Sequence, residues 1–303
     1  MTDTPHIRSR FASWLLFVSI AITACAIFVL TLVVMGTRLE NQSVAPKPPS
    51  ASEIERQDIA VSIAQTRATA QELQAANQDP ALQPLLGELV SASETWLDHV
   101  GGVWIPWPQG APEGYENPEL DLSAPEVSIS ALQSQLAAIS DKLSAATDVD
   151  PELSLSIATS ARTFAAHFAP AAERAQVCSS PDISVLASAV NSAPAIVTFD
   201  TARQWLEHDA ALREPENRGD EEYKITLLTE LTNSALDSGG KDARHPIAPL
   251  PQTEDTDSAV SSLVEHELLS HAAQLDQPQR TATVALLCTL NTQASVAGLP
   301  GAE

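Results

Sequence analysis

The sequence is poor in aromatic, basic and cysteine residues. Aromatic residues make up only 4% of the 303-residue chain, lysine occurs four times and cysteine three times. Sixteen basic residues stand against 39 acidic ones, which gives a net charge of −23 at pH 7. Because so acidic a chain repels the phosphates of nucleic acids and of anionic lipids, we expect no nucleic-acid partner. Most of the acidic side chains are expected to face solvent.

Catalytic and cofactor motifs are missing as well. The chain has no G-x-S-x-G elbow, P-loop or G-x-G-x-x-G sequence. The stretch EHELLSH, from Glu265 to His271, resembles the zinc-protease motif, but His266 and His271 are five residues apart instead of four. They therefore lie ~140° apart around a helix. His271 instead continues an apolar line, which is typical of a half-buried helix histidine.

The histidines also do not form the Glu-x-x-His pairs of ferritin-like di-iron bundles. Each histidine beyond residue 90 has a residue other than glutamate three positions before it. We therefore assign no metal ligand, no cofactor and no catalytic residue. A metal-binding, ferritin-like bundle or an enzyme that uses His99, His266 and His271 remains the alternative hypothesis.

One long stretch, residues 11–35, contains no charged residue and reads FASWLLFVSIAITACAIFVLTLVVM. At ~1.5 Å per residue, a helix of this length spans the ~30 Å hydrocarbon core of a bilayer. We predict a transmembrane signal anchor at the plasma membrane, crossing it once. Arg8 and Arg10 precede it, so residues 1–10 should form a cytoplasmic tail and the rest of the chain should lie outside.

Cys25 offers an alternative to an uncleaved anchor. Ile22 to Cys25 read ITAC and resemble the lipobox of bacterial lipoproteins, which implies cleavage before Cys25 and a lipid on its sulfur. Residues 26–35 remain apolar, whereas lipoproteins turn polar soon after the cysteine. We favour the uncleaved anchor and keep open a lipoprotein that is accessory to an envelope complex.

The remaining chain is rich in alanine and poor in β-branched runs, which favours helix over sheet. We expect a linker over residues 36–51 and an all-α, extracytoplasmic helical bundle over residues 52–297. Long loops should interrupt it near residues 101–122 and 238–257. The predicted helix starts include Ser52 with Glu55 as a capping box, Ser123 with Pro125, Asp150 with Pro151, and Asp200; a last helix should run over about 278–296. Apolar residues at helical spacing predict a buried seam at Ile129, Leu132, Leu136, Ile139 and Leu143.

The first long loop differs from the rest of the chain in its prolines and large apolar residues. Residues 103–122 read VWIPWPQGAPEGYENPELDL. A loop of this length is usually functional or disordered, and its tryptophans argue against disorder. These side chains either fold back to cover the bundle or present a surface to a partner. In the second case the binding residues are Trp104, Ile105, Trp107 and Tyr115.

Two cysteines, Cys178 and Cys288, lie beyond the predicted anchor. An even pair in an oxidising compartment predicts a structural disulfide. It would close a loop of 110 residues. The alternative is two buried, reduced cysteines that act as small apolar residues.

The alanine-rich helices, the ITAC stretch and the segment HVGGVWIPWPQGAPEGY together resemble uncharacterised membrane-anchored proteins of actinobacteria. The resemblance covers the first half of the chain. It implies a location in the cell envelope and brings no established activity. We therefore expect a single-pass envelope protein whose acidic helical domain binds or assembles with a partner protein and is not catalytic.

Overall fold

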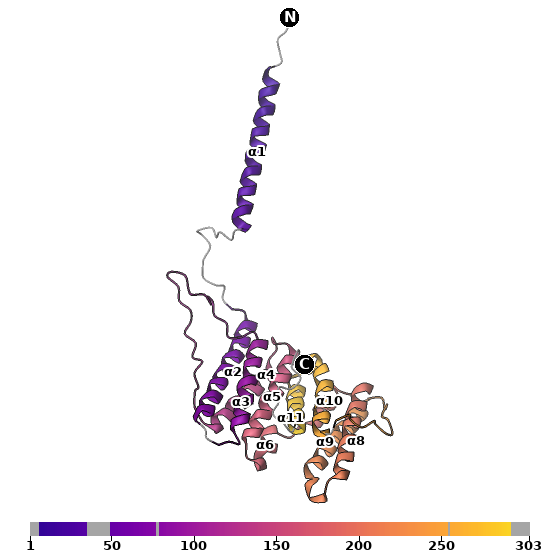
Figure 1. The fold of residues 1–303 in the computed structure, drawn as a ribbon. Coiled ribbons are helices and arrows are strands. Elements are labelled where there is room, and N and C mark those ends of the chain that lie inside the picture. The colour runs from indigo at the N-terminus through magenta and orange to yellow at the C-terminus, as the bar shows by residue number, and fades with distance from the viewer. Residues whose placement is uncertain (1–5, 35–48, 77–78, 254, 292–303) are drawn as a thin grey trace. The chain divides into compact units, whose positions relative to one another are not determined.

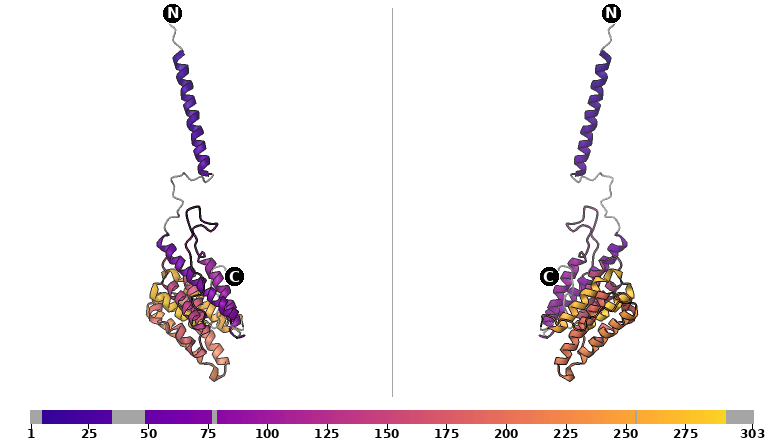
Figure 2. Two further views of the ribbon diagram at one scale, coloured as in Figure 1. Left: turned by 90° about the vertical axis from the view of Figure 1, so that its left-hand side faces the viewer. Right: turned by 90° about the vertical axis from the view of Figure 1, so that its right-hand side faces the viewer.

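The computed structural model describes residues 6–34, 49–76, 79–253 and 255–291. Every regular element in these ranges is a helix (Figures 1 and 2), so the predicted all-α class is confirmed. By its internal contacts the chain divides into two compact units. The first unit comprises Met1–Pro48 and Pro106–Asn117, and the second comprises Pro49–Ile105 and Pro118–Glu303.

The first unit contains helix α1, His6–Val34. Its described side chains are almost all exposed, including Trp14, Phe17 and Phe28. In α1 the structure describes an unbroken run of side chains over residues 16–31. Among all described residues, no helix is both long and apolar enough to cross a membrane.

The second unit contains all other helices. Its first part is formed by α2 (Ala51–Ala76), α3 (Gln83–His99), α4 (Ile129–Ala145) and α5 (Pro151–Phe168). Three short helices follow: η1 (Ala171–Glu173), α6 (Arg174–Cys178) and α7 (Ile183–Ala187). The chain continues through α8 (Ala193–Leu212), η2 (Pro215–Asn217), α9 (Gly219–Asp237), α10 (Thr256–Ser270), η3 (Ala272–Gln274) and α11 (Gln277–Leu290).

Two large hydrophobic cores, and a small cluster around Cys178 and Cys288, hold the second unit together. The first lies among α2, α3, α4 and α5, where the ring of Trp96 meets that of Phe164 edge-on, with centroids 6.0 Å apart. The predicted seam of α4 faces this core: its last four residues are buried, and Ile129 packs against the core edge. The seam is therefore confirmed.

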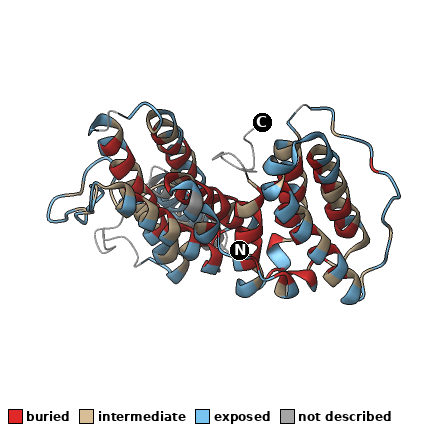
Figure 3. Ribbon diagram, turned by 90° about the horizontal axis from the view of Figure 1, so that it is seen from below, coloured by how far each residue is buried: buried red, intermediate tan, exposed pale blue. Residues whose placement is uncertain are grey.

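The second core lies among α7, α8, α9, α10 and α11. Helices α10 and α11 belong to both cores. Leu269 and Val284 lie in the first core, and the second contains Val260, Val264, Leu268, Leu286, Leu287 and Leu290. Figure 3 shows buried positions on the inward faces of the helices and exposed positions on their outer faces. Because α11 contacts α4, α5, α6, α7 and α10, most of its residues are buried, and these are mainly apolar.

The start of α2 differs from the prediction. The Ser50 N–H donates to Glu53 Oε2 at 3.0 Å, and the Glu53 N–H donates to Ser50 Oγ at 3.3 Å. The reciprocal cap is thus Ser50 with Glu53, and the expectation of Ser52 with Glu55 was wrong by two residues. Glu55 instead accepts the Asp148 N–H at 2.9 Å. The carboxylate that was predicted to cap α2 therefore binds the loop that follows α4.

Two other predicted helix starts were wrong for similar reasons. Helix α4 begins after Ser128, whose Oγ accepts the Ala131 N–H at 3.1 Å, whereas Ser123 binds the Asp121 side chain in the preceding loop. Helix α8 begins after Ser192, with a proline in its first turn. Asp200 therefore lies inside α8, where its buried carboxylate accepts from Arg203 at 2.8 Å.

Two predicted starts agree with the structure. Asp150 caps α5 by accepting the Leu153 N–H at 2.9 Å, with proline in the first helical turn. Helix α11 starts at a capping box of Asp276 and Gln279. The predicted end of this last helix, near residue 296, was wrong: α11 ends at Leu290, and the backbone of Asn291 is extended, while residues 292–296 lie outside the described residues.

Candidate functional site

The four predicted contact residues of the aromatic loop are divided between the two units. Trp104 and Ile105 belong to the second unit, with 36% and 40% of their surface exposed. Trp107 and Tyr115 belong to the first unit, where Tyr115 is exposed and Trp107 is half-buried. None of the four is buried, so each leaves apolar surface in contact with solvent.

The backbone of Trp104 is fixed by one side chain of α2. Gln57 Oε1 accepts the Trp104 N–H at 2.8 Å, and Gln57 Nε2 donates to the Trp104 carbonyl at 3.3 Å. An amide side chain that binds both groups of one residue mimics the pairing of two strands. The indole therefore leaves the loop from a backbone position that α2 determines.

An apolar groove lies beside Trp104 and has a volume of about 380 Å³. Its apolar lining comes from the residues just before α2, from the first turns of α2 and from the loop that contains Trp104: Pro49, Ile54, Val61, Trp104, Pro118 and Leu120. Ile54 is 57% exposed although it is fully apolar. Glu53, Gln57 and Asp58 place polar atoms at the same groove, which we call the Trp104 groove.

In the first unit, Asn117 pairs with the backbone of Trp107, and the Trp107 ring lies beside that of Tyr115. The Trp107 N–H donates to Asn117 Oδ1 at 3.0 Å, and Asn117 Nδ2 donates to the Trp107 carbonyl at 2.8 Å. The two rings lie with centroids 5.5 Å apart at a tilt of 53°. The two bonds between Asn117 and Trp107 therefore close this part of the loop, which carries both aromatic rings.

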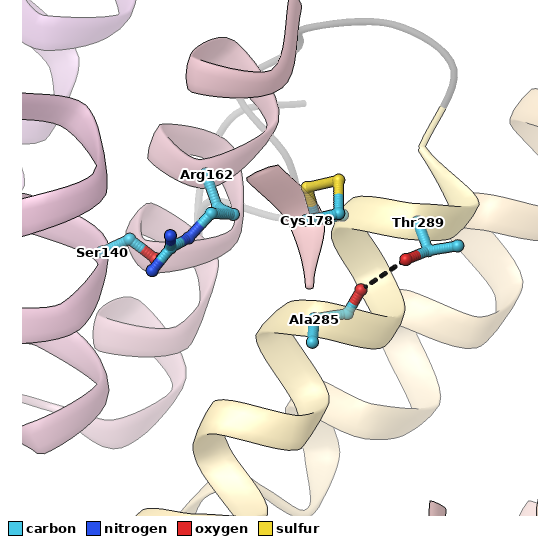
Figure 4. Close-up of a disulfide and its surroundings, with 6 residues drawn as sticks. Ser140, Arg162, Cys178, Ala285 and Thr289 are labelled. Carbon is cyan, nitrogen blue, oxygen red and sulfur yellow. Dashed lines mark hydrogen bonds between the residues drawn. A yellow bond between two sulfur atoms is a disulfide. The ribbon is translucent and has the colours of Figure 1, made fainter. Parts of the chain in front are cut away.

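The predicted disulfide pair comes together at one wall of the second unit (Figure 4). The sulfur atoms of Cys178 and Cys288 are bonded at 2.03 Å, and the Cα atoms are 5.4 Å apart. The bond joins α6 to α11, so it ties the short helices after α5 to a helix that contributes to both cores. Cys25, the alternative lipidation site, is exposed on α1 and is not bonded to another cysteine.

The two histidines of the EHELLSH stretch lie in different environments. His266 is exposed, whereas His271 is half-buried and its Nε2 lies 3.1 Å from Glu267 Oε1. Glu265 is buried, and burial raises the pKa of its carboxyl group to about 7. No three His, Cys, Asp or Glu side chains in the described ranges lie close enough to share a metal ion.

A second cavity, of about 340 Å³, was not predicted from the sequence. The disulfide forms part of its wall, and it shares no lining residue with the Trp104 groove. Polar residues from α5, α6, α9 and α10 also line it, together with Arg213. We call it the disulfide cavity. No sequence signal could have found it, because its residues lie up to 128 positions apart, from Thr163 to Asn291.

Ion pairs occupy one side of the disulfide cavity. Arg213 lies 2.9 Å from Glu221 and 2.7 Å from Asp209, and Lys224 lies 2.7 Å from Asp257. The side chains of Glu221 and Lys224 are 4% and 8% exposed, so this pairing takes place largely away from solvent. Such buried charges are tolerated because each has a partner of opposite sign.

Comparisons with known protein families, with curated proteins and with solved structures found no match to this chain. The fold itself defines an all-α protein with two large cores, to both of which α10 and α11 contribute. The Trp104 groove and the disulfide cavity are its two candidate binding sites.

Proposed function

We propose that this chain is a single-pass, membrane-anchored envelope protein whose acidic helical domain binds a partner protein and carries out no chemical step. The Trp104 groove is the observation on which the proposal rests. It offers apolar surface from two segments, α2 and the loop at Trp104, that are far apart in the sequence and fixed to each other by hydrogen bonds. Exposed apolar surface with a polar rim is characteristic of binding sites.

The energetics of the groove favour a bound side chain. Ile54 and Trp104 leave 57% and 36% of their surface exposed, and burying a large apolar side chain stabilises a complex by about 1.5–3 kcal/mol. The double hydrogen bond from Gln57 already fixes the Trp104 backbone. Binding therefore costs little ordering of this part of the loop, which is the advantage of a preorganised site.

The charge around the groove indicates the kind of partner. Glu53 and Asp58 lie at the groove, and the whole chain carries a net charge of −23. A complementary partner segment carries apolar side chains for the groove and lysine or arginine beside them. Long-range attraction would accelerate the encounter, and apolar contact would hold the complex.

The anchor is proposed from the sequence of α1. Residues 11–35 contain no charge, Arg8 and Arg10 precede them, and α1 is one continuous helix over His6–Val34. The bonded pair of Cys178 and Cys288 supports a position outside the cytoplasm, because cytosolic thiols are normally kept reduced. Together these features favour an N-terminus inside and a helical domain outside.

Site-specific photo-cross-linking in intact cells tests the groove. A photoreactive phenylalanine analogue replaces Ile54 in the full-length chain and, in a matched control, Ile247, which is 84% exposed in another loop. We expect an adduct of one defined mass from position 54 and none from position 247. Mass spectrometry of the adduct should identify a peptide with basic and apolar residues.

A second variant establishes whether the adduct depends on the groove. With the analogue at position 54, Trp104→Ser should reduce the adduct about tenfold, since a buried tryptophan contact is commonly worth more than about 1.4 kcal/mol. Ile247→Ser should leave it unchanged. Equal labelling from positions 54 and 247, or an adduct insensitive to Trp104→Ser, would refute the proposed site.

A further inference from the structure

One exposed segment of the second unit is attached mainly by a single buried side chain. We call residues 171–180 the α6 strap; they comprise η1, α6 and the two serines that follow. Among the side chains that the structure describes in the strap, only Cys178 is buried, Val177 is half-buried, and the others are exposed. Val177 and Cys178 pack against Ala166 of α5 and Cys288 of α11. Apolar contact therefore holds the strap only at its disulfide end.

Polar contacts add nothing to this attachment. The charged and amide side chains of the strap are those of Glu173, Arg174 and Gln176, and none of them has a hydrogen bond or ion pair to another residue in the described ranges. The backbone bonds of the strap are local: the Glu173 N–H donates to the Pro170 carbonyl at 2.8 Å, and the Ser179 N–H donates to the Gln176 carbonyl at 3.3 Å. The covalent bond of Cys178 is therefore the main link between the strap and the rest of the unit.

The residue after the bonded cysteine has a strained backbone. Ser179 has φ of 66° and ψ of 157°, and in the described part of the chain it is the only residue other than glycine with positive φ. Glycine alone adopts this region readily, because a Cβ atom meets the backbone there. Cys178 is bonded on one side of Ser179, and Asp182 caps α7 on the other side by accepting the Val185 N–H at 3.2 Å. The chain turns between these two fixed points, so the disulfide helps to hold Ser179 in its strained conformation.

The disulfide lies where a reductant can approach it. Cys178 and Cys288 keep 6% and 3% of their surface exposed, and both line the disulfide cavity of about 340 Å³. Arg174 and Ala175 of the strap line the same cavity and are exposed, so the cavity reaches the protein surface beside α6. Figure 4 shows the bond at the end of α6, against α11. Strained or accessible disulfides are the ones that are most readily reduced.

We infer that the Cys178–Cys288 disulfide is a redox-sensitive latch, whose reduction by a dithiol releases the α6 strap from α11. A thiolate of the dithiol attacks one cysteine sulfur and forms a mixed disulfide, and the other cysteine leaves as a thiolate. The second thiol of the reductant then displaces the first cysteine. Two electrons pass to the cysteines, which take up the two protons of the dithiol, and the reductant becomes a disulfide.

Release of the strap leaves the two large cores intact. Neither core has a buried member in the strap, and Val177 packs only at the edge of the first. Arg174, Ala175 and Cys178 form the strap's part of the cavity wall, so release opens the disulfide cavity on this side. Ser179 leaves its strained conformation at the same time, which favours the released state. The latch is independent of the partner surface proposed above, because the strap and the Trp104 groove share no residue.

Tryptic cleavage after Arg174 tests the release, because a protease cleaves a folded protein where a segment opens locally. The full-length protein is compared in its oxidised form and after reduction by dithiothreitol, with the reagent removed under nitrogen. We expect the fragment of residues 1–174 to form at least about tenfold faster from the reduced form. Cleavage after Arg203, which is ion-paired within α8, should remain slow in both forms. The double variant Cys178→Ser and Cys288→Ser should be cleaved after Arg174 as fast as the reduced wild type, with or without reductant.

Two outcomes of this experiment would overturn the inference. Unchanged cleavage after Arg174 would show that the strap stays bound without the disulfide. Equal acceleration after Arg203 would show that the bond supports the whole fold instead of the strap alone.

A pair of glycine variants keeps the test decisive if the double cysteine variant fails to fold. Ser179→Gly removes the strain, whereas Ser180→Gly changes the next exposed serine, whose φ is not positive. Each adds the same backbone freedom to the released strap, so their difference reports the strain. At equilibrium with dithiothreitol, the disulfide of Ser179→Gly should be about tenfold harder to reduce than that of Ser180→Gly, as measured by mass spectrometry of alkylated thiols. Equal reduction of the two variants would show that no strain is released at the latch and would likewise overturn the inference.

Discussion

The guanidinium of Arg56 donates to the carbonyl oxygen of Gly102 at 2.7 Å and to that of Val100 at 3.0 Å. These carbonyls follow the last turn of α3, where a helix leaves its acceptors unsatisfied and carries negative potential. Gly101 and Gly102 both adopt positive φ, of 85° and 67°, which only glycine tolerates readily. Arg56 thus ties α2 to the end of α3 at the point where the aromatic loop begins.

Removal of this contact should destabilise the protein. We expect Arg56→Ala to lower the free energy of unfolding by about 1–3 kcal/mol, because the partly buried carbonyls of Val100 and Gly102 lose a charged hydrogen-bond donor. Urea denaturation followed by circular dichroism measures the change. As a control, Arg67→Ala removes a more exposed pair with Glu94 at 3.4 Å and should cost less than about 1 kcal/mol. Equal losses in the two variants would contradict the role assigned to Arg56.

The buried carboxyl group of Glu265 should make stability depend on pH. Its pKa is raised from 4.5 to about 7 in the folded protein, so the folded state holds the proton more tightly than the unfolded state does. The contribution is fully present below about pH 4.5 and is lost as the pH rises to about 7. The loss should be on the order of 3 kcal/mol. Denaturation midpoints measured from pH 4.5 to 8 record it.

A neutral isostere separates Glu265 from the other titrating groups. Glu265→Gln should flatten the pH dependence in this window and make the protein more stable than the wild type at pH 8. Glu230→Gln, a change at an exposed position of α9, should retain the wild-type profile. An unchanged profile in Glu265→Gln would show that the carboxyl group does not titrate as described.

The disulfide should contribute substantially to stability. The two cysteines are 110 residues apart in the sequence. For a loop of this length, loop-closure entropy predicts a stabilisation of about 4–5 kcal/mol, and measured disulfides commonly contribute about 2–4 kcal/mol. We expect the double change of Cys178→Ser and Cys288→Ser to lower the unfolding free energy by about 2–4 kcal/mol. Reductant should destabilise the wild type and leave the double variant unaffected. Cys25→Ser is the control and should leave the stability unchanged, since Cys25 is not part of the bond. Alkylation of all three cysteines in the unfolded, unreduced protein would disprove the bond.

The proposed orientation predicts the location of the C-terminus. Alkaline phosphatase, which is active only outside the cytoplasm, should be active when fused after Glu303. A fluorescent protein that folds only in the cytoplasm should remain dark at the same site. The reverse result would place the helical domain inside and would remove the expected oxidising environment of Cys178 and Cys288.

Much of the secondary structure could be predicted from the sequence, because its signals are local. The all-α class follows from composition, and the buried seam of α4 follows from apolar residues three and four apart. The start of α5 follows from Asp150 and Pro151, whose effects reach only the first turn. The pairing of Cys178 with Cys288 could be proposed only because two cysteines beyond the predicted anchor allow a single choice.

The failures arose where a local signal had several candidates. Ser50 and Ser52 each precede a glutamate by three residues, so the sequence alone does not choose between two capping boxes. Tertiary structure chooses, because Glu55 is needed by the Asp148 N–H. Asp200 resembles a helix cap in the sequence, but its carboxylate instead pairs with Arg203 inside α8.

The sequence by itself therefore determined the helices, the charge-free stretch of residues 11–35 and the acidic surface. Only the tertiary structure decided that α11 serves two cores, that Gln57 fixes Trp104, and that Thr163 and Glu221 line one cavity. The physical reason is the distance over which each interaction acts along the chain. Helix periodicity and caps act across three or four residues, whereas Arg280 reaches the Ala146 carbonyl, at 2.7 Å, across 134 residues.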